Sequence, residues 1–295
     1  MNRTGASSRA PRPARPRYPT DKASEHRLMI EAAKTNTHAP AARAARGRGG
    51  AARSLASAAA VVALALSFAH AASAQKKVSS TFKLTRPSVR LQLMNRSGSV
   101  EIEGWDRKEI KVTAELETPS ARFTPVMNHD GLLIDVVGDT KGRENVGDVN
   151  FKIQVPADAE IDVKTMAGNI SVRNVRGSMV FAVTRDGDID LTGVRVMKVI
   201  ASNISGSILF DAELMGGGTY DLKSTSGQIN VHITGGSGFT LTATAPRTRN
   251  IDLGGFAARG KFDFSDSRRV SGRVGDGSAI LNATNLRGSI VFVSR

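Results

Sequence analysis

One short template recurs along the chain and constrains its fold more than any other feature. Each copy centres on a glycine, with apolar residues two and four positions after it and again five and seven positions before it. A small polar residue (Asn, Thr or Ser) always stands three positions before the glycine. The central glycines are Gly98, Gly168, Gly177, Gly187, Gly206, Gly227 and Gly288. Self-similarity of this kind predicts one supersecondary unit that is repeated.

The residue types of the template predict two short strands joined by a tight corner. Apolar residues at alternate positions place one face of each strand in a core. Glycine adopts the positive φ of a tight corner at little steric cost. The Asn, Thr or Ser before it can hydrogen-bond the backbone of that corner, whose polar groups would otherwise lack partners.

The spacing of the copies favours stacked rungs. The template recurs after 19 residues from Gly168 to Gly187, after 19 more at Gly206 and after a further 21 at Gly227. A constant period with two strands in each repeat predicts a β-solenoid. A β-sandwich of hairpins is the alternative, but its loops seldom keep one length and one corner chemistry. One register stays open, because Met179–Val183 is apolar at every position and alternation cannot decide which side chains face the core.

The chain as a whole is predicted to be all-β. Residues 161–295 are expected to form a β-helix-like β-solenoid with rungs of roughly 20 residues. Residues 75–160 also have strand patterns, but with longer connections, and are expected to form a less regular N-terminal β portion of the same continuous domain, 75–295. The template weakens between the last two copies, where 257–269 is expected to be a longer loop or hairpin.

The first 74 residues are not expected to belong to this fold. Residues 1–45 are rich in Arg, Ala and Pro without apolar periodicity, which predicts a disordered basic leader; a start codon assigned too far upstream is the alternative. Residues 46–74 have the pattern of a signal peptide, with the apolar run Leu55–Phe68 and a small-residue cleavage site that ends at Ala74. The mature chain is therefore predicted to be periplasmic or secreted.

The composition of the chain limits which classes of partner and which kinds of site it can have. Residues 1–74 hold 12 of the 41 basic and 3 of the 27 acidic residues, so the net charge of +14 falls to +5 over the rest of the chain. That mildly basic surface is not a nucleic-acid footprint. The absence of cysteine excludes disulfides, thiolate metal sites and a lipid-anchored lipoprotein. No second apolar run follows Ala74, so the mature chain is not expected to span a membrane.

Several stretches give the mature chain a resemblance to a known family. Asn95–Val112, with the letters EGWDR, and 268–281, with the letters GDGSA, resemble the beginning and end of the bacterial putative-adhesin domains. Val155–Val163 and the glycine repeats resemble the middle, so the likeness spans about residues 80–295. The resemblance implies an exported β-solenoid-like domain and brings no catalytic residues with it.

Three aspartates, Asp186, Asp188 and Asp190, form the first candidate site. They alternate, so one extended strand would point all three the same way, as carboxylates around Ca²⁺ would require. A calcium loop also needs Gly and Glu where Leu191 and Met197 stand. Other copies of the template hold Ser, Gln, Asn or Glu at the same positions, so a solvated acidic face is the preferred interpretation. No metal or cofactor site is predicted.

Trp105, the only tryptophan of the chain, is the second candidate. Its large apolar face could stack on a sugar ring. A cover over the end of a core is the commoner role for such an aromatic residue in a compact β domain. Trp105 and the three aspartates are therefore surface candidates for binding, and no residue is predicted to be catalytic.

The sequence favours a non-enzymatic function. His129 and His232 are the only histidines after residue 74, and neither has a motif partner. Asp188 with Arg173 or Lys198 could form the catalytic pair of a glycan lyase or hydrolase, but the sequence does not show that these residues lie close together. The predicted function is an adhesin-like binding or scaffold module of the bacterial cell envelope, with envelope polysaccharide or protein as partner. A glycan-active solenoid enzyme and a self-assembling structural protein are the alternatives.

The C-terminal end bears on self-assembly. Residues 288–295 place Ile290 and Phe292 in the core register, and no polar cap follows them. This pattern predicts an open end through which copies could associate end to end.

Overall fold

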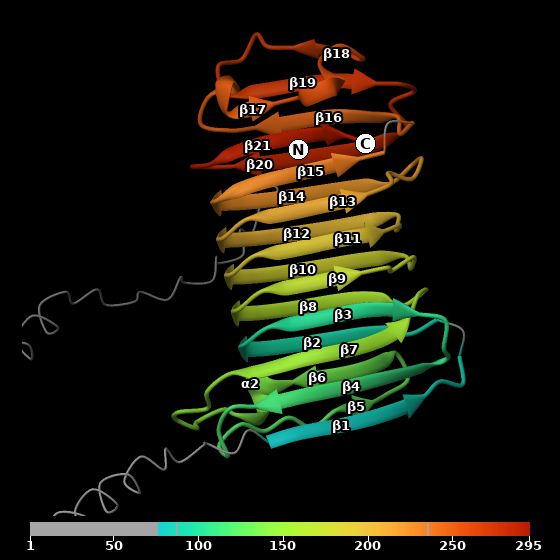
Figure 1. Ribbon diagram of the computed structural model, residues 1–295, viewed down its shortest axis with the longest axis vertical. Coiled ribbons are helices and arrows are strands. Elements are labelled where there is room, and N and C mark those ends of the chain that lie inside the picture. Colours follow the sequence, from blue (N-terminus) through green and yellow to red (C-terminus); the bar gives the residue numbers. More distant parts are fainter. Residues whose placement is uncertain (1–75, 87, 235) are drawn as a thin grey trace, which may run out of the picture. The chain divides into compact units, whose positions relative to one another are not determined.

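The computed structural model describes residues 76–86, 88–234 and 236–295, all within one compact unit, Ala69–Arg295. The predicted leader and signal peptide, 1–74, lie outside the described residues. Two β-sheets face each other across an apolar core (Figure 1).

The two sheets hold nearly all the regular structure. In spatial order, the 10-stranded sheet contains β1 (Lys76–Lys83), β4 (Glu109–Leu116), β7 (Val149–Pro156), β3 (Val100–Trp105), β9 (Ile170–Arg173), β11 (Ile189–Val194), β13 (Ile208–Ala212), β15 (Gln228–Ile233), β21 (Ser289–Ser294) and β17 (Ile251–Asp252). The 11-stranded sheet contains β18 (Gly260–Asp263), β19 (Arg269–Val274), β16 (Phe239–Thr244), β20 (Ala279–Asn285), β14 (Thr219–Ser226), β12 (Lys198–Ser205), β10 (Met179–Asp186), β8 (Glu160–Ala167), β2 (Arg90–Ser97), β6 (Gly131–Asp135) and β5 (Val126–Met127).

Helical turns are short. They are α2 (Val136–Asp139), η2 (Thr248–Asn250) and η3 (Gly254–Phe256). Among the described residues, no helix has the length and apolar character needed to cross a membrane. The predicted all-β class is confirmed.

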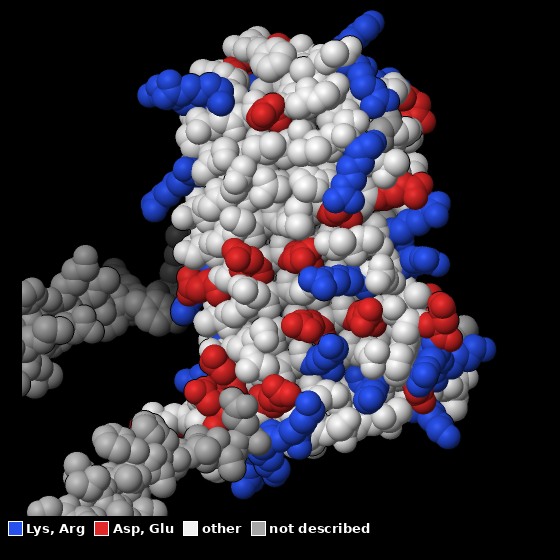
Figure 2. Space-filling model, in the orientation of Figure 1, with Lys and Arg blue, Asp and Glu red and all other residues white. Residues whose placement is uncertain are grey.

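The repeat units alternate between the sheets. The first strand of each unit lies in the 11-stranded sheet and the second in the 10-stranded sheet, as in β8–β9, β10–β11 and β12–β13. Each strand pairs in parallel with its equivalent in the next rung, and template positions meet in register, as Ile170, Ile189 and Ile208 do. This arrangement confirms the β-solenoid. The outer face of the 10-stranded sheet, seen in Figure 2, carries polar and charged side chains.

The corner glycines stack on one another. Gly187 and Gly206 have φ of +152° and +110°. A Cβ at Gly206 would lie 2.3 Å from the carbonyl oxygen of Gly187, and one at Gly227 would lie 2.0 Å from that of Gly206. Glycine is therefore required at these corners both by the backbone conformation and by the approach of the preceding rung.

The small polar residue of the template is buried beside each corner. Thr184 Oγ1 donates a hydrogen bond to the carbonyl oxygen of Gly168, and Asn203 Nδ2 donates to that of Gly187, both at 3.1 Å. The predicted bond to corner backbone is confirmed, and in these two cases the carbonyl belongs to the preceding rung. The buried members of the series are Asn95, Thr165, Thr184, Asn203, Ser224 and Asn285.

The template copy centred on Gly177 is not a corner. Val180 and Ala182 are fully buried, and the odd-numbered residues of Met179–Val183 face outward. The core face of β10 therefore belongs to the Gly187 copy alone. The expectation for Gly177 is wrong because this strand is apolar on both faces, so its register came from its neighbours rather than from its own alternation.

The parallel stack begins before residue 161. β2 and β3 already form a rung, parallel to β8 and β9. The chain between β3 and β8 is an insertion that supplies β7, β4, β6 and β5, and β1 pairs antiparallel with β4 at the edge of the 10-stranded sheet. Both parts thus share the same two sheets.

The C-terminal strand does not lie at the end of the stack. β21 lies between β15 and β17, and β20 lies between β14 and β16. The chain between β15 and β20 supplies β16, β17, β18 and β19, and β18–β19 is the hairpin expected near 257–269. The prediction that 288–295 leaves an open end is wrong, because this earlier segment folds over the last rung (Figure 1).

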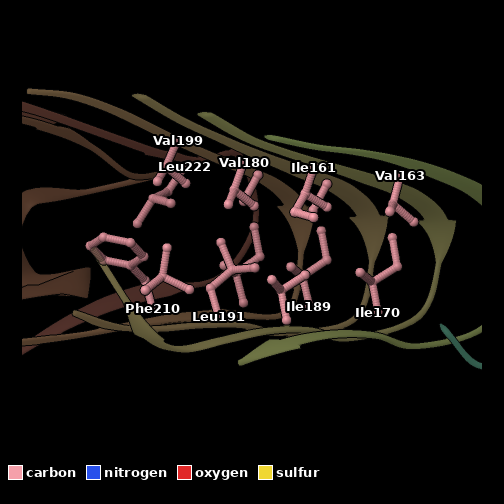
Figure 3. Packing of buried hydrophobic residues seen from close by; sticks show 14 of the residues in the cluster. Ile161, Val163, Ile170, Val180, Ile189, Leu191, Val199, Phe210 and Leu222 are labelled. Atoms are coloured by element: carbon pink, nitrogen blue, oxygen red, sulfur yellow. The ribbon is translucent and has the colours of Figure 1, made fainter. Parts of the chain in front are cut away.

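The core fills the space between the sheets without any disulfide. Side chains from opposite sheets meet there (Figure 3), with Ile161, Val163, Val180, Val199 and Leu222 on one side and Ile170, Ile189, Leu191 and Phe210 on the other. These side chains are at most 1% exposed. Burial of each contributes about 1.5–3 kcal/mol.

Candidate functional site

The three predicted aspartates do not share one strand. Asp186 ends β10 in the 11-stranded sheet, whereas Asp188 directly precedes β11 and Asp190 is the second residue of that strand, in the 10-stranded sheet. The expectation that all three point the same way is wrong, because Gly187 between the first two is a corner with a φ of +152°.

Two of these acids are paired with basic or hydroxyl neighbours. Asp186 Oδ2 accepts a hydrogen bond from Arg185 Nε at 2.8 Å. Asp190 Oδ2 lies 3.4 Å from Arg173 Nη2, and its other oxygen accepts from Thr192 Oγ1. Asp186 is exposed and Asp190 is half-buried, and each has a local partner, as on a solvated face.

Asp188 links one rung to the next. Its Oδ1 accepts from the backbone N–H of Ser207 at 2.7 Å, and its own N–H donates to Asn169 Oδ1 at 2.9 Å. The Ser207 hydroxyl accepts in turn from the N–H of Gln228 at 3.4 Å. Each of these residues follows a corner glycine directly, so this column of side chains ties successive corners together.

The catalytic pair drawn from the sequence is not assembled. Arg173 pairs with Asp190 rather than Asp188, and Lys198 begins β12 in the other sheet. Within the part of the chain that the structure describes, no group of three or more His, Asp or Glu side chains could hold a metal ion.

The two histidines lie on different elements. His129 is exposed in the turn before β6, where its Nδ1 lies 3.4 Å from Asp130 Oδ1. His232 faces outward from β15 with its Nδ1 4.0 Å from Asp211 Oδ2, and Asp211 pairs more closely with Arg295, at 2.5 Å. Neither arrangement has the geometry of a catalytic triad.

Trp105 is held firmly at the end of β3. Gly104 lets this strand pass close to the next turn, since a Cβ there would lie 2.1 Å from the carbonyl oxygen of Asn174. The indole Nε1 donates to the carbonyl oxygen of Glu109 at 2.9 Å, and the guanidinium carbon of Arg107 lies 5.0 Å from the ring centroid. The half-buried ring therefore has a fixed orientation and a cation beside it.

One cavity opens beside Trp105, and a second cavity lies next to the first. The larger has a volume of about 290 Å³ and includes in its lining Leu84, Arg86, Trp105, Lys108, Pro156 and Asp158. The smaller has a volume of about 210 Å³ and includes Lys83, Leu84, Arg86, Asn128 and His129. Leu84 and Arg86 line both, so the segment after β1 separates two neighbouring hollows.

Hydrogen bonds join the turns around the larger cavity. The N–H of Ala157 donates to the carbonyl oxygen of Trp105, and the N–H of Leu84 donates to that of Lys108, both at 3.0 Å. Arg86 Nη1 donates to the carbonyl oxygen of His129 at 3.1 Å. Four turns that are distant in sequence are thus fastened at one place.

The outer face of the 10-stranded sheet holds a smaller hollow of about 90 Å³. Glu101 and Glu103 of β3, Lys152 of β7 and Arg173 of β9 line it. Figure 2 shows acidic and basic side chains mixed over this half of the face, and fewer over the half toward β15 and β21.

Sequence patterns single out Trp105 but not the residues around it. Arg86, Lys108 and Pro156 come from separate turns, and no spacing rule connects them. The only available signal is the EGWDR stretch, whose Arg107 contacts the indole.

Comparison with known proteins places the chain in a family. The Toastrack DUF4097 family model matches residues 89–246 of the 295. Solved structures with similarity include a putative cell adhesion protein from Clostridium sporogenes ATCC 15579 (13% identity, TM-score 0.46, covering 75% of this chain and 98% of that one) and a putative adhesin from Bacteroides fragilis NCTC 9343 (9%, 0.33, 75% and 97%). No curated protein matches. The predicted resemblance to the putative-adhesin domains is confirmed, and the chain belongs to the Toastrack DUF4097 family.

Proposed function

We propose that this chain is an exported, non-enzymatic, adhesin-like binding or scaffold module of the bacterial cell envelope. The family supports the adhesin-like part of this proposal. The signal-peptide pattern at 46–74 supports export to the periplasm or beyond. Envelope polysaccharide or protein is the partner class that such a location offers.

The observation that carries the proposal is the set of hydrogen bonds and ion pairs that the candidate acids make. Asp188 accepts a hydrogen bond from the backbone of the next rung, and Asp186 and Asp190 pair with neighbouring arginines. Acids with such partners hold a scaffold together rather than transfer protons. The outward side chains of the two sheets then provide extended surfaces for contact.

The hollow lined by Glu101, Glu103, Lys152 and Arg173 favours a second candidate, a glycan-active enzyme. Two carboxylates beside two cations on adjacent strands are what a glycan lyase or hydrolase would need. A test adds purified protein to polysaccharide from the envelope and measures released reducing or unsaturated ends. Release that disappears in Glu101→Gln would establish the enzyme and contradict the non-enzymatic proposal.

Binding itself is tested by co-sedimentation. Protein purified from cells that express the full sequence is mixed with isolated envelope fragments, and the fraction that sediments is measured against protein concentration. Saturable sedimentation is expected, and heat-unfolded protein is the control. Sedimentation no greater than that of an unrelated protein of equal net charge would count against the proposal.

Export is tested on the same material. The N-terminus of protein recovered from the periplasm or the medium is expected at Gln75, and mass spectrometry of the intact chain measures it. Retention of the full-length chain in the cytoplasm would contradict the envelope location.

A further inference from the structure

We propose that the cavity beside Trp105 binds an acidic sugar, a pyranose ring that carries a carboxylate. The inference rests on the proposed binding function and gives its ligand class. The cavity volume of about 290 Å³ approaches the lower end of small-molecule sites, about 300 Å³. One sugar unit of a longer glycan fits such a hollow better than an entire chain does.

The site is preorganised. Main-chain hydrogen bonds from Ala157 to Trp105 and from Leu84 to Lys108 fix three of the turns that surround the cavity. The bond from the indole Nε1 to the carbonyl oxygen of Glu109 fixes the ring itself. A ligand would therefore meet a preformed surface, with little loss of loop entropy on binding.

The apolar part of the lining suits a sugar ring. Leu84, Trp105, Pro156 and Ala157 contribute it, and they stand next to one another around the cavity. The C–H face of a pyranose packs on an aromatic ring while its hydroxyls stay at the polar rim. Asp106 and Asp158 lie at that rim and can accept hydrogen bonds from those hydroxyls.

The charged part of the lining indicates a carboxylate. Arg86, Arg107 and Lys108 line the larger cavity, and Arg107 is paired with Glu109, so Arg86 and Lys108 are the cations that can meet a ligand. Among the described residues, Arg86 makes its contacts, to His129, through Nη1, which leaves Nε and Nη2 to donate. A guanidinium edge of this kind binds a carboxylate with two parallel hydrogen bonds. Lys108 has no ion-pair partner in the described part of the chain and adds a second cation.

The ligand class is tested with a matched pair of probes. Trp105 is the only tryptophan, so its fluorescence reports on this cavity alone. Trigalacturonate is expected to change the emission saturably. Its fully methyl-esterified form, which has the same rings without the charges, is expected to bind at least tenfold more weakly. Equal affinity for the two probes would overturn the acidic-sugar assignment.

Variants then locate the carboxylate. Arg86→Gln is expected to raise the Kd for trigalacturonate at least tenfold and to leave the indole in place as reporter. Lys223→Gln, on the exposed outer side of β14, is the charge-matched control and is expected to leave the Kd within twofold. If Arg86→Gln lowers the midpoint of thermal unfolding, Lys108→Gln, a substitution of an exposed residue, provides the same test. An unchanged Kd in the folded variants would overturn the proposal.

This inference and the proposed function can fail separately. A chain that sediments with envelope fragments but shows no emission change with trigalacturonate retains its binding function and loses this site. A chain that does neither loses both.

Discussion

Each corner of the stack depends on two residues with different tasks. The glycine allows a carbonyl oxygen of the preceding rung to come within a distance that no side chain would permit. The buried Asn, Thr or Ser three positions earlier supplies a hydrogen bond to a corner carbonyl. The two tasks can be separated by substitution.

Gly206→Ala is expected to lower the free energy of unfolding by about 3 kcal/mol, because strain at positive φ costs about 1–3 kcal/mol and the new Cβ would also displace a rung. Gly142→Ala is the control, since its φ is +75° but its Cβ would meet nothing within 4 Å. Urea unfolding measures both. Equal losses would show that the approach of Gly187 to Gly206 contributes nothing.

Asn203→Val is expected to cost about 1–3 kcal/mol, because it leaves the part-buried carbonyl oxygen of Gly187 without the hydrogen bond from Asn203. Asn203→Thr keeps a donor of the kind that Thr184 uses one rung earlier, and is expected to cost less. The two variants are nearly equal in shape, so their difference in urea midpoint measures the hydrogen bond. A Thr variant as unstable as the Val variant would contradict this role.

At the scale of elements, β10 is the strand whose register the sequence leaves open. Val180 is fully buried, whereas Val183 faces outward and is half-buried. Val180→Asn is expected to destabilise the protein by about 3 kcal/mol, because it buries an amide in an apolar core, and Val183→Asn by less than about 1 kcal/mol. Thermal unfolding of the two variants measures the difference. The reverse order would show that the strand is shifted by one residue.

Tyr220 of β14 ties two turns to the stack. Its hydroxyl donates to the carbonyl oxygen of Val196 at 3.0 Å and accepts from the N–H of Met215 at 2.8 Å. Burial of the phenol raises its pKa above the ordinary value of about 10. Since the folded state holds this proton more tightly, its contribution to stability is complete below about pH 10 and falls as the pH rises through the raised pKa.

Tyr220→Phe is therefore expected to cost about 1–3 kcal/mol at neutral pH, where both hydrogen bonds are lost, and less above pH 10. Urea unfolding at pH 7 and at successive values above pH 10 measures the difference between the variant and the native chain. A difference that stays constant across that range would contradict the raised pKa.

Elements differ in how far their sequences determine them. The six true corners could be predicted because only one face of each strand is buried, so alternation and corner chemistry agree. Gly177 could not be excluded, because β10 is apolar on both sides and only its neighbours decide its register. The cavity beside Trp105 could not be predicted at all, since three turns that are distant in sequence build it and their meeting is a property of the stack.

At the scale of the whole molecule, the segment between β15 and β20 protects the last rung. β16 pairs along β20 from Ala279 to Thr284, and β17 pairs with β21 at Ile290 and Val291, so this segment covers the edge of β20 and part of the edge of β21. Natural sheets cover or charge their edges because an exposed edge recruits further chains. At the opposite end, β1 is the edge strand, and Lys76, Lys77 and Lys83 charge it.

Replacement of 236–278 by a linker as short as 213–218, the connection between β13 and β14, is expected to convert a monomer into concentration-dependent oligomers. The exposed edges of β20 and β21 would pair with edges of other copies. Light scattering against protein concentration measures this, with the intact chain as control. A variant that stays monomeric would show that these edges are not adhesive. An intact chain that already assembles would support the self-assembling alternative.

The position of β20 and β21 also sets the order in which the protein can finish folding. These strands follow β16–β19 in the sequence, yet they lie between those strands and β14 and β15, and Asn282 donates a hydrogen bond to Asp221, 61 residues earlier. Such non-local closure is slow, and the two parts of the stack stay separate until β20 and β21 pair with both. Completion of the stack is therefore expected to be the slow step of folding, because it needs strands that the chain supplies after both of their neighbours.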